Sequence, residues 1–209
     1  MYAYEGLGSI YWHMVSKLLL AVLDTARYAK QTGCSPDVLT GLYAAYYDVR
    51  EGIGFNKAPD IYGAFPTDPY SHTPGFAGAR QPGMTGQVKE EVLTRLGELG
   101  VRVTGGQVAF QPTLLREREF LNEIATLDFY GVSGKAESVT LQPEQLGFTY
   151  CQVPVVYSKG GSGSATVTFS SGKQEIFEDG QLDADVSASL FMKLGDVARI
   201  DVSVASTLD

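Results

Sequence analysis

The chain has 209 residues, of which 44% are hydrophobic and 19% are charged, and its formal net charge is −8. This apolar content is ordinary for a protein that buries a core, and it excludes an intrinsically disordered chain. Because an acidic surface repels phosphate backbones and anionic lipid headgroups, we expect neither nucleic acid nor a membrane as a partner.

Metal and disulfide chemistry is also not expected. The sequence contains two cysteines, Cys34 and Cys151, and two histidines, His13 and His72, which are far apart. Such sparse use fits neither a disulfide framework nor a zinc site, and no cofactor is expected. It suits a reducing compartment, and the apolar run at residues 18–23 is far shorter than the ~20 residues of a membrane span. We therefore expect a cytoplasmic protein.

The first half of the chain shows a helical period. Apolar residues recur every four positions from Ile10 to Val22, and Gly33 is suited to end this helix. The segment Ser35-Pro36-Asp37 then supplies an N-cap, a proline at the first helical position and an early acid. A second helix should therefore follow, and the short connection predicts an antiparallel helical hairpin.

Residues 52–86 are rich in glycine, proline and aromatic residues and show little period. Connections of this length are usually functional or disordered, and the aromatic residues argue against disorder. A third helix is predicted from about residue 85 to residue 99, and Gly100 ends it.

Beyond residue 100 the apolar period changes to two. Residues 101–104 and 107–110 flank Gly105-Gly106, which predicts a hairpin with a two-residue turn. Further strands are predicted at residues 127–132, 138–141, 148–157, 165–169, 175–177, 187–192 and 198–204. Helices followed by short strands predict an α+β fold, with a helical domain over residues 1–100 and an antiparallel β-sandwich or jelly roll over residues 101–209.

Three segments of the first half carry a resemblance to a known family. They read GSIYWHMVSKLLLAV at residues 8–22, YGAFPTDPYSHTP at residues 62–74 and GMTGQ at residues 83–87. They resemble the C-terminal region of six-hairpin glycosidase-like proteins, which are distantly related to the cellobiose and chitobiose phosphorylase group of glycoside hydrolases. The resemblance implies that the helices are the last ones of an (α/α)6 toroid, and that a C-terminal β-domain follows them.

The same resemblance implies site residues. In the phosphorylase relatives, a His-containing loop and a Gly-Thr-rich helix start contribute to the phosphate and sugar site, which places His72, Thr85 and Gly86 nearest to it. The phosphorylase pattern has a second threonine where this chain has Gln87, and this difference argues against phosphorolysis. The family's general acid lies earlier in the toroid and has no counterpart here. The chain is therefore expected to be a C-terminal fragment that is not catalytically complete alone.

Further candidates follow from side-chain chemistry. Glycosidic cleavage needs carboxylates beside the sugar, and Asp68 is the candidate catalytic carboxylate in the loop. Trp12 offers an indole face to the apolar side of a sugar ring, and His13 can hydrogen-bond its hydroxyls. Plainer roles remain open, because Asp68 can cap a turn, Thr85 can be an N-cap and the others can simply pack. The remaining nearby acids are Glu51, Asp60, Glu90 and Glu91.

Three functions follow as alternatives. The first is a fragment of a glycoside hydrolase or phosphorylase that binds an oligosaccharide or glycoside. It predicts that Trp12, Asp68, His72 and Gln87 converge beside an exposed apolar surface, where the rest of the toroid or a second copy packs. The second is a non-catalytic carbohydrate-binding module that uses aromatic residues of the β-half. The third is a structural domain that buttresses a partner chain.

Overall fold

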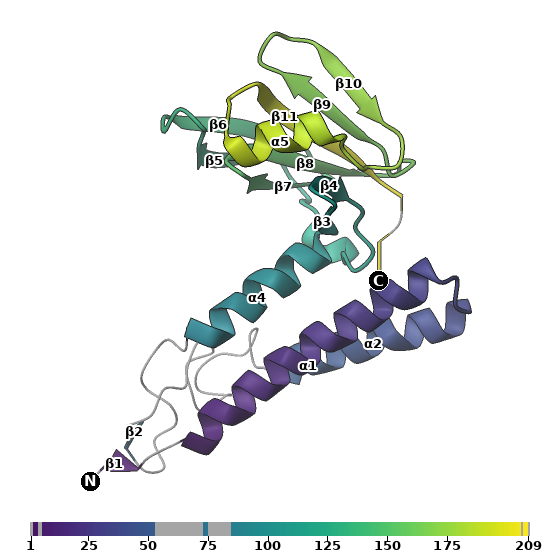
Figure 1. The fold of residues 1–209 in the computed structure, drawn as a ribbon, viewed down its shortest axis with the longest axis vertical. Helices are drawn as coiled ribbons and strands as arrows, with labels where there is room; N and C mark the ends of the chain where they lie inside the picture. The colour runs from purple at the N-terminus through teal and green to yellow at the C-terminus, as the bar shows by residue number, and fades with distance from the viewer. Residues whose placement is uncertain (1, 4–5, 53–72, 75–84, 206, 209) are drawn as a thin grey trace. The chain divides into compact units, whose positions relative to one another are not determined.

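The computed structural model describes residues 2–3, 6–52, 73–74, 85–205 and 207–208, with side chains at residues 14–51, 90–205 and 207–208. The chain divides into two compact units, Met1–Arg95 and Leu96–Asp209. Helices dominate the described part of the first unit and strands dominate the second (Figure 1). This segregation confirms the predicted α+β class.

The helical unit contains α1 (Gly6–Gln31), α2 (Pro36–Gly52) and the first part of α4 (Thr85–Glu98), together with a short antiparallel pairing of β1 (Tyr2–Ala3) and β2 (Thr73–Pro74). Helices α1 and α2 lie side by side as an antiparallel hairpin (Figure 1). Gly33 ends α1 as the sequence predicted, because it adopts a left-handed conformation with φ of 70°. None of the helices described here is long and apolar enough to cross a bilayer.

One face of each helix of the hairpin is buried. On α1 the buried stripe follows Leu19, Leu23 and Ala26, which recur at the three- and four-residue spacing of a helix face. On α2 the rings of Tyr46 and Tyr47 meet edge to face, with centroids 5.2 Å apart. The helix is confirmed, but the stripe read in the sequence is not the buried one, because Met14 and Leu18 on that stripe are exposed.

The β-unit consists of nine described strands, one helix and a short 3-10 turn. They are β3 (Val101–Thr104), β4 (Gln107–Phe110), η1 (Glu117–Glu119), β5 (Ala125–Tyr130), β6 (Ala136–Leu141), β7 (Gln145–Tyr150), β8 (Val153–Lys159), β9 (Ala165–Phe169), β10 (Gln174–Phe177), α5 (Ala184–Met192) and β11 (Val197–Val204). A five-stranded sheet has the order β10-β9-β11-β8-β7, and β3-β4 and β5-β6 form two separate hairpins.

The five-stranded sheet is mixed. Strands β8 and β11 run parallel, whereas the other neighbouring strands run antiparallel. Strand β11 is therefore flanked on both sides, and its residues Ile200, Val202 and Val204 belong to the core of the unit. Helix α5 contacts β11 and β4 and contributes Val186 and Leu190 to the same core (Figure 1).

The Gly105-Gly106 hairpin is confirmed. Val101 to Thr104 pair with Phe110 to Gln107, and the two glycines have φ values of 58° and 82°. Two positive φ values in succession are the backbone of a type I′ turn, which glycine adopts without the clash of a Cβ atom.

The single strand predicted over residues 148–157 is wrong. The structure has two strands there, β7 and β8, joined by a turn at Cys151 and Gln152. These residues have φ values of 50° and 66°, and neither is a glycine, asparagine or aspartate. The turn therefore carries none of the residue types by which such turns are recognised in a sequence.

The strand predicted over residues 187–192 is also wrong, because the segment belongs to α5. The Asp183 side chain caps this helix by accepting a hydrogen bond of 2.8 Å from the Val186 N–H. Lys193 ends it in a left-handed conformation with φ of 51°. Val186 and Leu190, four residues apart, then face the core together.

A buried hydroxyl connects β8 with the end of α4 inside the β-unit. Tyr157 is fully buried, its hydroxyl donates to the Leu99 carbonyl at 2.5 Å, and its ring meets Phe148 edge to face at 5.2 Å. A buried carbonyl that loses such a donor has no access to water as a substitute.

We therefore expect Tyr157→Phe to lower the free energy of unfolding by about 1–3 kcal/mol, because it leaves the buried Leu99 carbonyl without this donor. Tyr130→Phe is the matched control: Tyr130 is 69% exposed, and its hydroxyl should contribute less than about 0.5 kcal/mol. Urea denaturation followed by circular dichroism measures both. Equal stability of the two variants would contradict a structural role for the Tyr157 hydroxyl.

Candidate functional site

The predicted loop residues Asp68 and His72 lie outside the described residues. The backbone of Trp12 and His13 belongs to α1, but their side chains are outside the described part. Their predicted convergence with the loop therefore stays a prediction.

Thr85, Gly86 and Gln87 are the first three residues of α4, and their side chains are also outside the described part. The start of α4 at Thr85 agrees with the predicted helix start. Backbone N–H groups in the first turn of a helix lack intrahelical acceptors, so this end of α4 can donate to a ligand oxygen.

An ion pair joins α1 and α4 close to these candidates. The Lys17 Nζ atom lies 3.8 Å from Oε1 of Glu90. Lys17 is one helical turn after His13, and Glu90 is one helical turn after Gly86. The ion pair therefore brings together the two helix segments that carry most of the candidates found by sequence.

Glu90 is an unusual carboxylate because it is almost completely buried. Its side chain is 10% exposed, whereas that of Lys17 is 60% exposed. The second oxygen, Oε2, has no hydrogen-bond partner among the described residues. The nearby Thr94 hydroxyl does not supply one, since it donates to the backbone carbonyls of Glu90 and Glu91, both at 2.9 Å.

Ser16, the residue before Lys17, has the same property. It is 2% exposed, and its Oγ atom has no hydrogen-bond partner within the described part of the chain. Burying a polar atom without a partner costs free energy, so each such atom needs an explanation. A ligand or a bound water that hydrogen-bonds to these atoms is one explanation, and a site that gives up stability for binding is typical of functional residues.

The two unpartnered atoms have complementary hydrogen-bonding abilities. An ionised carboxylate oxygen only accepts, while a serine hydroxyl donates and accepts. Together with the Lys17 ammonium they suit a ligand that carries several hydroxyl groups. Among the described residues no three His, Cys, Asp or Glu side chains are grouped as metal ligands.

The sequence favoured Asp68 over Glu90 as the candidate catalytic carboxylate. The signal that could have selected Glu90 is its position one turn after Gly86, which places it on the helix face that continues from the candidate helix start. Its burial could not be read from the sequence, because Glu90-Glu91 looks like an ordinary solvated pair of acids.

Comparison with known proteins adds no family assignment. No protein-family model matches the chain, and no curated protein is significantly similar to it.

The burial of Glu90 generates a prediction about stability. We expect Glu90→Leu to raise the free energy of unfolding by about 1–3 kcal/mol, because it removes a buried oxygen that has no partner and adds apolar contact. Asp24→Leu is the control, since Asp24 also pairs with a cation, Arg27 at 3.6 Å, but is 74% exposed. Its stability should change by less than about 0.5 kcal/mol.

Thermal and urea denaturation of the two variants give the comparison. A Glu90→Leu protein that is less stable than the wild type would contradict this interpretation and make Glu90 a structural residue.

Proposed function

We propose that this chain is the C-terminal part of a carbohydrate-active enzyme of the six-hairpin type, a glycoside hydrolase or phosphorylase that acts on glycosidic bonds. The observation that carries the proposal is Glu90, a buried carboxylate whose Oε2 atom has no partner among the described residues. It lies on α4 one turn after the candidate helix start and faces α1 through Lys17.

In this proposal the helical unit binds one side of a saccharide. Glu90 Oε2 accepts a hydrogen bond from a sugar hydroxyl, and the Ser16 hydroxyl exchanges hydrogen bonds with a second one. Trp12, one turn before Ser16, supplies the apolar platform. Glu90 is proposed as a binding carboxylate, because its ion-pair partner is the cation Lys17 and hydrolysis by two carboxylates needs a second acid beside the sugar.

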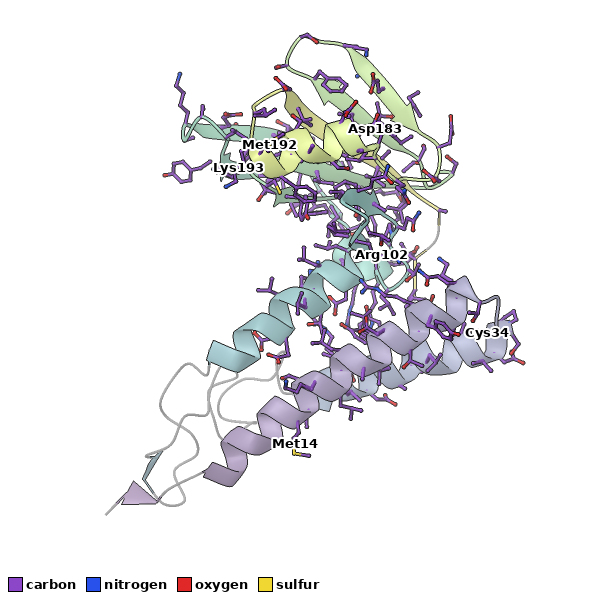
Figure 2. The ribbon with its side chains drawn as sticks, in the orientation of Figure 1. Met14, Cys34, Arg102, Asp183, Met192 and Lys193 are labelled. Atoms are coloured by element: carbon purple, nitrogen blue, oxygen red, sulfur yellow. The ribbon has the colours of Figure 1, made fainter. Side chains whose placement is uncertain are left out.

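The exposed apolar residues of the helices support a toroid. Met14, which Figure 2 labels on α1, and Leu18 are 65% and 51% exposed. They lie one turn apart, on a different side from the buried Leu19 and Leu23. On α4, Val92 and Leu93 are each 54% exposed. Toroid helices pack against neighbours on both sides, so a helix with apolar residues outside its buried face fits such a position.

The β-unit fits a C-terminal β-domain of the sandwich or jelly-roll type. Hairpin β5-β6 packs on β7 at Gly147, where an added Cβ would come within 2.7 Å of Leu141 and 3.3 Å of Leu127. Hairpin β3-β4 adds Val108 and Phe110 to the core. In the proposal these two hairpins form the second layer over the five-stranded sheet.

The proposal places the general acid outside this chain, as the family resemblance implies. Gln87 stands where the phosphorylase pattern has a threonine, which argues against phosphate binding, and the proposal covers both a hydrolase and a phosphorylase. The partners are then an oligosaccharide or glycoside, and either the remainder of the toroid or a second copy of the chain.

The first test follows the fluorescence of Trp12, the only tryptophan of the chain, during titration with cellobiose and chitobiose. We expect a saturable change, and we expect Glu90→Gln to weaken binding about tenfold or more, because it removes a charged hydrogen-bond acceptor. Glu91→Gln is the matched control, since it makes the same change at the next position of α4. If the folded wild type shows no change in emission with either sugar, the proposed site is wrong.

The second test concerns the exposed apolar stripe of α1. We expect the chain to associate as its concentration rises, and the double variant Met14→Glu, Leu18→Glu to remain monomeric, because two charges on this face prevent its burial. Val103→Glu is the control, because Val103 is 52% exposed but lies in the β-unit. Sedimentation velocity over a hundredfold concentration range distinguishes the outcomes, and a wild-type monomer throughout would contradict the expectation.

A further inference from the structure

A hollow lies entirely within the β-unit. Four connections contribute to its lining: the β5-β6 turn, the β7-β8 turn at Cys151-Gln152, the β9-β10 turn at Ser170, and the connection from α5 to β11. Its volume is about 400 Å³, within the ~300–1,000 Å³ that small-molecule sites usually have. A neighbouring hollow of about 360 Å³ shares two of its lining residues, Phe129 and Glu137. Figure 2 shows Met192 and Lys193 at the end of α5, on the side of the unit where the β5-β6 hairpin lies.

Gln152 is held in this hollow by a strained turn. Cys151 and Gln152 have φ values of 50° and 66°, and for residues other than glycine the left-handed conformation costs about 1–2 kcal/mol each. The side-chain Nε2 atom of Gln152 donates a hydrogen bond to the Gly131 carbonyl at 3.1 Å, which connects the β7-β8 turn with the β5-β6 turn. Glycine would adopt this backbone conformation without strain. A non-glycine residue that is kept there despite the strain is typical of a side chain that has a function.

Glu137 lies on β6 beside Gly131, and its side chain is exposed. A Cβ atom at Gly131 would overlap the Glu137 carboxylate where it now lies, so the glycine leaves room for this placement. The Gly131 backbone is fixed, because its N–H donates to the Lys135 carbonyl at 3.0 Å and its carbonyl accepts from the Gly134 N–H at 2.9 Å. The exposed carboxylate is available to accept hydrogen bonds from a ligand.

The lining also defines the charge of the ligand. Both hollows contain acidic side chains and no lysine, arginine or histidine. An anion would meet the Glu137 carboxylate without a compensating cation in the lining, so a phosphate, sulfate or nucleotide is disfavoured.

The remaining groups suit a ligand with several hydroxyls. The carboxylate of Glu137 accepts hydrogen bonds. The Ser133 hydroxyl, which accepts from the Lys135 N–H at 3.3 Å, can donate to a ligand, and the Ser170 hydroxyl, which donates to the Asp196 carbonyl at 3.2 Å, can accept from one. The ring of Phe129 supplies an apolar face, and Leu194, which is 57% exposed, extends it. Sugars present this combination, with hydroxyls at their edge and C–H groups on their faces.

We propose that the hollow formed by Phe129, Glu137 and Gln152 binds a neutral saccharide, as a site of the β-unit separate from that of the helices. The site uses an aromatic face, an exposed carboxylate and an amide, and it stands whether or not the helical unit binds sugar. Cys151 takes no part in the binding as a thiolate. Burial raises the pKa of its thiol more than nearby Lys193 lowers it, so the thiol remains protonated at neutral pH.

The strained turn provides a sharp pair of variants. Gln152→Gly removes the side chain together with its hydrogen bond to the Gly131 carbonyl, and it relieves the left-handed backbone, so we expect the fold to be retained. Cys151→Gly relieves the same turn but leaves every lining side chain in place. We expect both proteins to retain the melting temperature of the wild type within a few degrees.

Saturation-transfer NMR of the full chain with the methyl β-glycosides of glucose, galactose, mannose and N-acetylglucosamine tests the proposal. We expect at least one of them to bind with a Kd of about 1 mM, with Gln152→Gly weakening it about tenfold and Cys151→Gly changing it less than about twofold. Asp24→Asn, a change at an exposed acid of the helical unit, should leave this binding unchanged.

Four results would overturn the proposal. They are no binding by any of the four glycosides, binding retained in Gln152→Gly, equal losses in the two turn variants, and tighter binding of glucose 6-phosphate or glucosamine than of methyl β-glucoside. Loss of binding in Gln152→Gly with binding retained in Cys151→Gly would support the β-unit site.

Discussion

The β-unit depends on the position of one strand, β11, between β8 and β9. It pairs in parallel with β8 and antiparallel with β9, so it provides hydrogen-bond partners to both halves of the sheet. Three of its residues, Ile200, Val202 and Val204, are at most 2% exposed. Strands β9 and β10 and helix α5 lie between β8 and β11 in the sequence. The two strands that β11 pairs with, β8 and β9, therefore both precede it in the chain. Without this strand, β8 and β9 would be the edges of two smaller sheets.

The two units place polar groups in opposite ways. In the helical unit, Glu90 and Ser16 put unpartnered polar atoms inside a packed face, which lowers stability unless a ligand or water meets them. In the β-unit the Gln152 side chain is carried by a turn between two strands of a well-packed sheet. The free-energy cost of its placement is backbone strain at Cys151 and Gln152. Both arrangements keep side chains ready for hydrogen bonding, and the second leaves the hydrophobic core undisturbed.

Periodicity was enough to predict the elements whose faces are regular. The first helix and Gly33, the Gly105-Gly106 hairpin and the strand at residues 165–169 follow directly from apolar spacing and turn residues. The turn at Cys151-Gln152 could not be predicted, because tertiary contacts hold two unfavourable residues in left-handed conformations. Helix α5 was missed because its capping residue, Asp183, lies outside the apolar run that resembled a strand.

The candidate sites show the same limit. Sequence chemistry singles out residue types and their neighbours, as it did for Asp68, His72 and Trp12. It does not reveal which acid is buried or which side chains from distant turns meet. Glu90 became a candidate through its burial and its contact with α1, and Glu137 and Gln152 through a hollow formed by elements far apart in the chain. These are properties of packing, and no local pattern encodes them.

Strand β10, at one edge of the five-stranded sheet, has a consequence for how copies of the chain can meet. The strand is only four residues long, and Ile176 on it is 64% exposed. An ion pair between Lys173 and Glu175 lies along the same edge. Short edges that carry charges pair poorly with strands of other molecules. The sheet is therefore protected at this edge from intermolecular β-pairing and fibril growth, even though it presents an apolar side chain there.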